Sequence, residues 1–547
     1  NGDDSGRLIF RANQDSDYEM NKIVNTQNVI LKSRAEQFGI TREDININYG
    51  QFKITLNLKD YTYNIECANI DNLKISFMGS SVAHGQGAQD LEGYTYQFDQ
   101  ILKRRTMDEG TAGFYRSDIS IGGNNTINLL NRYERDLIGD CSKYVVFGLS
   151  LGNEGVHENG QTAFDQFEKN LKLLIQKAKS DGKIPVVVNN YTRADYNSSD
   201  YNYIKQMNLL IGEWDVSSVN VLGAIDDGNG KWAEGYKDDA LHPNKAGHTE
   251  FTYAFVPSLF EALEANKPLP VFTNTTSISF TNSTTGVLNF TPENIVHPFT
   301  TSIDFKTNST GQIITYKTDS SANGSVTLDE NGFLKYTSPT GLTIVDDTIA
   351  NDNLWHNVTL THFYARGETL LYRDAVLVGS VSEKVELDTF SAHPEGAPVN
   401  IDYRNWLFYR SGMNNLEIGK IYNKILFQSS LELYAPLDAT AVLSPDPFIN
   451  LAQSTNTIDA DNVSLGYKEF KFKNIQIYPN PVEEILNIKM LDNDHIKNVT
   501  LYNTNGSLLE KIGGSNKSID FKLFPTGLYF IKVQTSSNLY TLKIVKK

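Results

Sequence analysis

The sequence predicts one α/β domain followed by two all-β domains. Between residues 73 and 263, short apolar runs alternate with amphipathic runs, which is the pattern of a parallel sheet covered by helices. After the stretch "EANKPLP" at 264–270, the chain changes to short alternating runs separated by Thr, Asn, Ser and Gly, as is typical of β-sandwiches. A chain of 547 residues is also too long for one hydrophobic core, which stops growing at roughly 250–300 residues.

Residues 1–70 are predicted to form a small α+β segment. Apolar residues recur near helical spacing over 17–40, and residues 46–65 alternate in the manner of a β-hairpin. The segment carries no chemical motif. Because the chain begins with Asn1 rather than Met, we expect that an export signal has been removed from it.

The α/β domain is predicted to span 71–264. Phe164, Phe167 and Leu171 share one face of an amphipathic helix that Gly182 ends. Ligands of open parallel sheets bind beyond the carboxyl ends of the strands, so the loops there are the place to look for a site. The expected strands are 73–79, 115–121, 143–150, 184–190 and 217–222.

Three further segments are predicted after the α/β domain. Residues 270–438 read as a β-sandwich, and 439–470 are polar and without periodicity, which is typical of a linker. Residues 471–547 again consist of strands and turns, including a tight turn at Thr504-Asn505-Gly506, and are predicted to form a small independent sandwich.

The loops of the α/β domain carry the residue types that nucleophilic acyl transfer needs: a hydroxyl, a base, a carboxylate and oxyanion donors. Ser81 follows the first strand, Gly123 in "SIGGNNT" follows the second, and Asn153 in "GLSLGNEG" follows the third. Asp239 stands three residues before His242 in "KDDALHPNKAGH", a spacing that lets the carboxylate fold back on the imidazole. Taken singly, each block is as well explained by a helix cap or a surface histidine. Together they favour a catalytic site.

These four blocks, in this order, resemble those of the SGNH (GDSL-type) hydrolase family over residues 71–264. The resemblance implies a flavodoxin-like three-layer α/β fold, with Ser81 as the nucleophile, His242 as the base and Asp239 as the carboxylate that orients it. It also implies an oxyanion hole formed by the N–H groups of Ser81 and Gly123 and the side-chain amide of Asn153.

Two positions depart from the family pattern. The usual Gly-Asp-Ser reads Gly79-Ser80-Ser81, and the Asp that often follows the third-block Asn is Glu154. Neither position transfers a proton, so we expect a changed pocket shape rather than lost activity. The first departure leaves the choice of nucleophile between Ser80 and Ser81 open, with Ser81 preferred because it holds the aligned position.

Other side chains of the same loops are candidates for substrate binding. The histidines among them could line the pocket, but surface histidines are commoner. The aromatic residues could stack on sugar rings near the site, and they are equally well explained as plain surface residues. His248 is expected to pack on the closing helix. The histidines lack the pairing of metal ligands, so no metal is predicted at the site. The candidate substrate-binding residues are Ser80, His84, Glu154, His157, Trp232 and Tyr236.

The segment 270–438 resembles laminin-G-like (concanavalin-like) sandwiches. Trp355-His356 and Tyr372-x-Asp374 stand in place, whereas the glycine expected next is Ala375. Such modules often bind glycans, sometimes through calcium, and others only brace a neighbouring domain. No cofactor is predicted, and a structural calcium ion in this sandwich is left open.

The segment 471–547 resembles the C-terminal sorting domain of the type nine secretion system of Bacteroidetes. The resemblance lies in "IYPNPVEEILNI" and in "FPTGLYFIKVQTSSNLYTLKIVKK". It implies that the outer-membrane secretion machinery is a partner, and that the protein is secreted or displayed on the cell surface of a Gram-negative bacterium of that group.

Charge and cysteine content narrow the alternatives. A net charge of −16 without a basic stripe argues against binding to nucleic acid or anionic membranes. No apolar run approaches the roughly 18–20 residues that span a bilayer. Cys67 and Cys141 each precede a strand-like run, so they are either paired in a disulfide or two buried thiols.

The sequence therefore predicts an exported serine esterase, similar to carbohydrate O-acetylesterases, that removes small acyl groups from a glycan. The glycan part rests on family analogy. A lipase or lysophospholipase is the nearest alternative, although the loops are rich in Asn, Asp and Gly rather than apolar. The other alternative is a surface glycan-binding protein whose hydrolase domain is inert.

Overall fold

The computed structural model divides the chain into two compact units, 1–463 and 464–547. The predicted helix at 17–40 and the turn at 504–506 lie outside the described residues. Within the described residues, no helix is both long and apolar enough to cross a lipid bilayer. The described residues are 44–49, 52–57, 62–67, 69–273, 276–281, 286–318, 323–438, 446–460, 475–490, 494–503, 507–513, 518–536 and 539–547.

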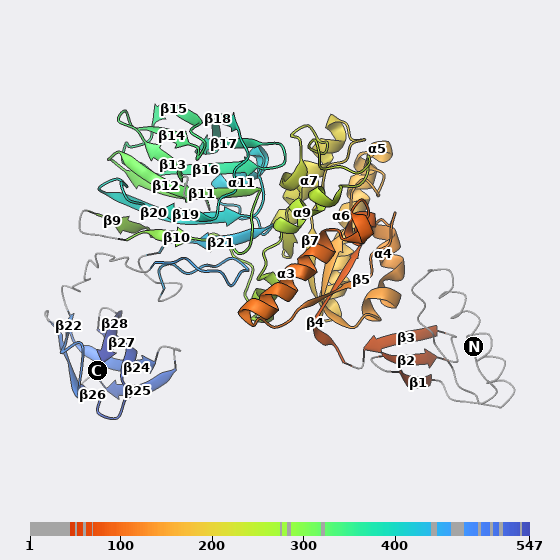
Figure 1. Cartoon of the computed structure of the whole chain (residues 1–547). Coiled ribbons are helices and arrows are strands. Elements are labelled where there is room, and N and C mark those ends of the chain that lie inside the picture. Colours follow the sequence, from red (N-terminus) through yellow and green to blue (C-terminus); the bar gives the residue numbers. More distant parts are fainter. Residues whose placement is uncertain are drawn as a thin grey trace. The chain divides into compact units, whose positions relative to one another are not determined.

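Three antiparallel strands precede the α/β domain: β1 (Asp44–Tyr49), β2 (Phe52–Asn57) and β3 (Thr62–Cys67) (Figure 1). The last residue of β3, Cys67, forms a disulfide with Cys141, and their Cα atoms are 5.5 Å apart. Of the two states that the sequence left open for the cysteines, the structure shows the disulfide. The bond ties the N-terminal sheet to the chain just before strand β6 (Ser142–Gly148).

The α/β domain contains a five-stranded sheet in the order β5-β4-β6-β7-β8, with every neighbouring pair parallel. The prediction of a parallel sheet with helices on both sides is confirmed. Side chains of successive residues along a strand point to opposite faces of the sheet. Phe77 and Met78 of β4 therefore belong to different hydrophobic cores. The strands are β4 (Asp71–Gly79), β5 (Tyr115–Asp118), β6 (Ser142–Gly148), β7 (Ile184–Val188) and β8 (Ser217–Val219).

Helices cover both faces of this sheet (Figure 1). One core contains residues of α3 (Tyr94–Glu109), α9 (Lys245–Tyr253) and α10 (Leu259–Glu264). The other contains residues of α4 (Thr126–Arg132), α6 (Gln161–Ser180) and α7 (Ser198–Glu213). Short helices lie in the loops: α2 (Ser81–His84), η1 (Gln89–Leu91), the π-helix η2 (Tyr133–Ile138), α5 (Val156–Asn159) and α8 (Leu222–Ile225).

The next region is a sandwich of two antiparallel sheets. One has the order β18-β17-β16-β11-β20-β21 with β9 on β20, and the other β10-β19-β12-β13-β14-β15. The elements are β9 (Ile278–Phe280), β10 (Leu288–Phe290), β11 (Phe299–Thr307), β12 (Gly311–Lys317), β13 (Asn323–Leu328), β14 (Phe333–Thr337), β15 (Thr343–Ile349), β16 (His356–Phe363), β17 (Glu368–Arg373), β18 (Val376–Ser382), β19 (Thr389–Ala392), β20 (Ile401–Tyr409), α11 (Asn415–Tyr422) and β21 (Leu431–Ala435).

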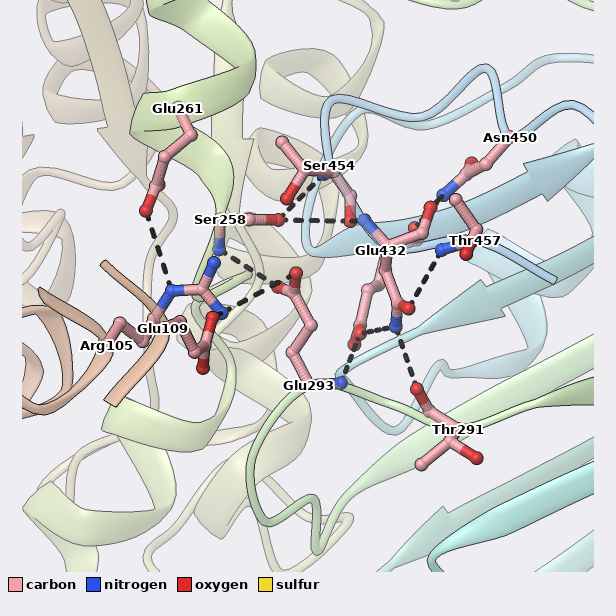
Figure 2. Close-up of polar contacts among 12 residues, drawn as sticks. Arg105, Glu109, Ser258, Glu261, Thr291, Glu293, Glu432, Asn450, Ser454 and Thr457 are labelled. Carbon is pink, nitrogen blue, oxygen red and sulfur yellow. Dashed lines mark hydrogen bonds and ion pairs between the residues drawn. The ribbon is translucent and has the colours of Figure 1, made fainter. Parts of the chain in front are cut away.

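The sandwich and the α/β domain share a polar interface, and both belong to the first compact unit. Figure 2 shows Arg105 of α3 between Glu261 of α10 and Glu293. Nε of Arg105 lies 3.5 Å from Oε1 of Glu261, and Nη1 lies 3.7 Å from Oε1 of Glu293. The carboxylate of Glu293 accepts a hydrogen bond from the Ser258 N–H at 2.9 Å. Buried charges are costly unless they are paired or hydrogen-bonded, and these contacts give Arg105 and Glu293 partners at the interface.

Part of the segment predicted as a linker packs against this interface. The side-chain amide of Asn450 donates to the Glu432 carbonyl at 2.8 Å, and its oxygen accepts the N–H of Tyr434 at 3.0 Å. The hydroxyl of the fully buried Ser454 lies 3.2 Å from that of Ser258. The side chain of Asn450 thus forms hydrogen bonds with backbone groups at the interface. A polar composition is shared by free linkers and by segments that pack in this way, so composition alone does not tell them apart.

The second compact unit contains two small sheets, with the orders β22-β23-β26 and β25-β24-β27-β28, around one apolar core. The strands β24 and β25 pair across the predicted turn. The strands are β22 (Ile475–Tyr478), β23 (Ile485–Met490), β24 (Ile496–Asn503), β25 (Leu508–Gly513), β26 (Ser518–Asp520), β27 (Gly527–Thr535) and β28 (Leu539–Lys546).

Candidate active site

Ser81 lies at a tight turn between β4 and helix α2. Gly79 ends the strand, and a Cβ atom there would lie 2.2 Å from the Gly148 carbonyl oxygen, so only glycine fits. Ser80 follows in extended conformation as the N-cap residue, fully buried, with its N–H donated to Gly148 at 3.2 Å. Ser81 is then the first helical residue, where backbone N–H groups have no intrahelical acceptor. The turn therefore buries Ser80 and leaves Ser81 partly exposed.

Asp239 and His242 face each other within the loop before α9. The Nδ1 atom of His242 lies 2.9 Å from Oδ2 of Asp239. Oδ1 of the same carboxylate accepts the N–H groups of Leu241 and His242 at 2.7 and 2.8 Å. Burial pushes the pKa of Asp239 upward, but the hydrogen bonds from His242 and the Leu241 N–H outweigh it and hold that pKa below its usual value. The carboxylate is thus ionised and fixed in place.

The second ring nitrogen of His242 meets the serine. Nε2 lies 3.0 Å from Oγ of Ser81, although 161 residues separate the two in the chain. An ionised carboxylate can only accept hydrogen bonds, so Nδ1 carries the ring proton and Nε2 presents a lone pair to the hydroxyl. The structure therefore brings Ser81, His242 and Asp239 into one hydrogen-bonded chain.

The loop after β5 lies beside Ser81. A Cβ atom at Gly122 would lie 3.8 Å from Cβ of Ser81, and the next residue, Gly123, has φ +74° with open space where its side chain would be. The amide of Asn153 donates one hydrogen bond, at 3.1 Å, to the carbonyl of Asn124 in the same loop. Its second amide hydrogen remains for another acceptor. Gly123 and Asn153 are thus gathered at the edge of the sheet where Ser81 lies.

Glu154 differs from its predicted role in substrate binding. It is buried, and Oε2 accepts the N–H of Thr126 at 3.0 Å while Oε1 accepts the amide of Gln166 at 2.7 Å. The carboxylate therefore anchors the first turn of α4 to α6. Since α4 begins directly after the loop that contains Gly123, the hydrogen bond between Glu154 and the Thr126 N–H also helps to hold that loop in position.

His84 and His157 are each paired with a carboxylate near the surface. Nδ1 of His84 lies 2.9 Å from Asp118, and Nδ1 of His157 lies 2.7 Å from Asp200. The hydrogen bond to Asp200 raises the pKa of His157. Their side chains are 43% and 48% exposed, so both retain a face toward solvent. Substrate contact by either histidine stays a prediction.

The aromatic candidates separate into a buried and a half-buried residue. Trp232 is 5% exposed, stacks on the buried Tyr191 at a centroid distance of 5.8 Å, and donates Nε1–H to the Ala240 carbonyl at 3.3 Å. It therefore supports the Asp239–His242 loop and has no free face for a sugar. Tyr236 is half-buried, and Nζ of Lys384 from the sandwich lies 5.4 Å from its ring centroid.

His248 has a supporting role that the predicted packing on the closing helix did not include. Nε2 lies 2.9 Å from the Gln86 carbonyl oxygen, and Nδ1 accepts the N–H of Tyr94 at 3.2 Å, so the ring is neutral. Burial lowers its pKa to about 4. It thereby fixes the loop that includes Gly87, where a Cβ atom would lie 2.1 Å from the Pro243 carbonyl oxygen next to His242. A spacing pattern contains no signal for such a long-range contact.

Two segments match known protein families. Residues 77–249 match the model of the GDSL-like lipase/acylhydrolase family, and residues 476–547 match that of the secretion system C-terminal sorting domain. No curated protein matches the chain.

Solved structures show further similarities. A catalytic mutant of the acetylxylan esterase Axe2 from Geobacillus stearothermophilus is 17% identical, with a TM-score of 0.29, over 34% of this chain and 94% of that one. LAE5, an alpha/beta hydrolase enzyme from the metagenome of Lake Arreo, is 20% identical, with a TM-score of 0.28, over the same shares. A pentraxin from Limulus polyphemus is 13% identical, with a TM-score of 0.24, over 28% of this chain and 84% of its own.

Proposed function

We propose, from the match of residues 77–249 to the GDSL-like lipase/acylhydrolase family model, that the protein is a serine esterase that removes acetyl or similarly small acyl groups from a glycan. The observation that carries the proposal is the chain of contacts from Ser81 through His242 to Asp239, at 3.0 and 2.9 Å. These are the distances that a nucleophile, its base and an orienting carboxylate need.

The sorting domain determines where such an enzyme acts. A match at residues 476–547 indicates type nine secretion, so the protein interacts with that machinery and is secreted or displayed at the cell surface of a Bacteroidetes-type bacterium. An acylated polysaccharide outside the cell is therefore a substrate within its reach.

In the proposed reaction, His242 takes the proton of Ser81 while Oγ forms a bond to the ester carbonyl carbon. The intermediate then collapses, and the alcohol leaves with the proton that His242 returns. Water, activated by the same nitrogen, cleaves the acyl-enzyme and releases the acid. Asp239 keeps the ring in the productive tautomer and stabilises the imidazolium that forms in each step.

The negative charge on the carbonyl oxygen needs hydrogen-bond donors. We assign this role to the N–H groups of Ser81 and Gly123 and to the remaining amide hydrogen of Asn153. Each such donor is worth about 3–4 kcal/mol of the barrier. All reacting groups belong to the protein, so we propose that no cofactor takes part. Dialysis against a chelator should leave the rate unchanged, whereas a structural calcium ion in the sandwich would reveal itself as a lower melting temperature.

The first experiment is acetate release from 4-nitrophenyl acetate by the wild type, Ser81→Ala and Ser80→Ala. We expect Ser81→Ala to lose activity by about 10⁴-fold or more and Ser80→Ala to keep most of it. Equal rates for the wild type and Ser81→Ala would end the esterase proposal and favour a glycan-binding protein with an inert hydrolase domain.

A second experiment separates substrate classes. Esters with short and long acyl chains should show a strong preference for the short ones, because the loops around the site are rich in Asn, Asp and Gly. A preference for long chains would favour the lipase alternative. A panel of acetylated plant and algal glycans, assayed for released acid, then identifies the sugar.

A further inference from the structure

The loop that follows β7 places an arginine, Arg193, between two loops of the candidate active site. A Cβ atom at Gly152, next to Asn153, would lie 2.4 Å from Nη1 of Arg193. On the other side, the N–H of Ala194 donates to the Ala240 carbonyl at 2.9 Å, two residues before His242. Arg193 thus stands at the carboxyl edge of the sheet, where substrates of open α/β folds bind.

The guanidinium is held in one orientation. Asp195 accepts hydrogen bonds from Nε and Nη2 at 3.0 and 2.7 Å, and the Tyr196 ring centroid lies 5.5 Å away. The side chain is only 11% exposed. Within the described part of the chain, Nη1 has no hydrogen-bond acceptor, so its two N–H groups remain available.

The same loop contains other unused polar atoms. The amide nitrogen of Asn190 and the hydroxyl of Thr192 are buried and have no partner among the described residues. Asn190 is anchored by its oxygen, which accepts the N–H of Leu151 at 2.6 Å, one residue before Gly152. Buried polar groups normally have partners, so these two atoms are places where an ordered water could bind behind Arg193.

We propose that Arg193 is a specificity-determining residue, whose Nη1 donates hydrogen bonds to neutral oxygen atoms of the sugar that carries the ester. This inference rests on the proposed esterase function and names the part of the substrate that the site recognises. Asp195 offsets the charge of the guanidinium, and Asp238 and Asp239 are exposed on the neighbouring loop, so a carboxylate-bearing sugar is disfavoured. A hydrocarbon chain would leave the Nη1 donors unpaired, which selects against lipids.

The test compares kcat/KM for sugar esters with kcat/KM for 4-nitrophenyl acetate, which has no sugar. The sugar probes are glucose pentaacetate and partially acetylated xylo- and manno-oligosaccharides. We expect Arg193→Ala to lose about 10- to 100-fold on the best sugar ester, mainly through KM, and less than about 2-fold on 4-nitrophenyl acetate. Arg193→Lys should recover little, because an ammonium cannot bond Asp195 and the sugar in the same fork.

Two further variants keep the result interpretable. Asp195→Asn frees the guanidinium to move and should give a smaller loss on the sugar ester only. Arg373→Ala is the matched control, because Arg373 is similarly buried and pairs with Asp346 at 2.6 Å, but on the sandwich. Both rates should be unchanged in this control.

Three results would overturn the inference: an equal loss on both substrate types in Arg193→Ala, no loss on either, or no hydrolysis of any sugar probe by the wild type. Failure of the esterase proposal itself is a different result, namely unchanged hydrolysis of 4-nitrophenyl acetate in Ser81→Ala.

Discussion

The α/β domain and the sandwich each contain a histidine paired with an aspartate, and the two pairs differ in one contact. Nδ1 lies 2.9 Å from a carboxylate oxygen both in His242–Asp239 and in His356–Asp374. Hydrogen bonds hold the pKa of both carboxyls below the usual value, against the opposing effect of burial. The second nitrogen of His242 meets the Ser81 hydroxyl, whereas that of His356 lies 3.1 Å from another carboxylate, Asp352.

That one contact decides what each pair can do. Its hydrogen bond to Asp374 raises the pKa of His356, and with a carboxylate at each nitrogen both nitrogens act as donors. Such an imidazolium has no lone pair to take a proton and serves as a clamp between the start of β16 and the β17–β18 turn. A His–Asp pair is therefore a base only where its outer nitrogen meets a neutral group that can lose a proton.

The largest expected effect on kcat comes from removing the histidine of the first pair, His242, and it is compared with removal of His356 from the second pair. His242→Ala should lower kcat on 4-nitrophenyl acetate by about 10⁴-fold or more, because it removes the base that is hydrogen-bonded to Oγ of Ser81. His356→Ala should keep the wild-type kcat while lowering the melting temperature. Comparable loss of activity in both variants would contradict the distinction between the two pairs.

Removing the carboxylate charge should have the next largest effect. In Asp239→Asn the amide can donate to Nδ1, which places the ring proton on Nε2 and removes the lone pair that faces Ser81. We expect a fall in kcat of about 10³- to 10⁴-fold with KM nearly unchanged. Steady-state kinetics measures this, with Asp374→Asn as the matched substitution that leaves kcat intact.

The buried neutral histidine of the α/β domain predicts a dependence of stability on pH. The pKa of His248 falls from 6.5 to about 4 on folding, so the unfolded chain binds its proton first as the pH drops. The stability that this histidine contributes is complete above about pH 6.5 and is lost toward pH 4, by roughly 3 kcal/mol. Melting temperatures across this range should fall more steeply in the wild type than in His248→Gln.

His356 provides a second test, because its contribution to the stability of the protein changes with pH in the opposite direction. Since its pKa is raised in the folded protein, its contribution is complete below about pH 6.5 and is lost as the pH rises through the folded value. His356→Gln should therefore cost the most stability in acid, where His248→Gln costs the least. The same pH trend in both variants would show that their protonation states have been assigned wrongly.

The smallest expected effect concerns the turn beside His356. Ala375 adopts a φ of +62°, in the left-handed region where a side chain is unfavourable and glycine is preferred. Ala375→Gly should therefore stabilise the protein by about 0.5–1 kcal/mol, after the greater entropy of the unfolded glycine is counted. Thermal unfolding would measure it, and a lower melting temperature would contradict it.

Much of the site follows from local patterns. Gly79-Ser80-Ser81 comes directly after an apolar run, which predicts a strand followed by a helix start, and parallel strands bring such turns to one edge of a sheet. Asp239 and His242 are three residues apart, so one loop is enough to bring their side chains together. Within a strand, a helix or a single loop, spacing determines which side chains can meet.

Other features depend on contacts between distant segments. The burial of Ser80 against Gly148, the packing of Trp232 on Tyr191 and the pairing of Cys67 with Cys141 each join residues separated by dozens of positions. No local spacing distinguishes a buried tryptophan from an exposed one, because burial depends on what packs above it.

By itself the sequence determined the order of strands and helices, the loops that carry the chemistry and the residue types in them, because periodicity and turn composition are local properties. Only the tertiary structure decided that Ser81 rather than Ser80 faces His242, that Glu154 and Trp232 act as supports, and that Arg193 stands between the two loops. The reason is that the exposure of a side chain, and its contacts with residues far away in the sequence, are determined only when separate segments pack together.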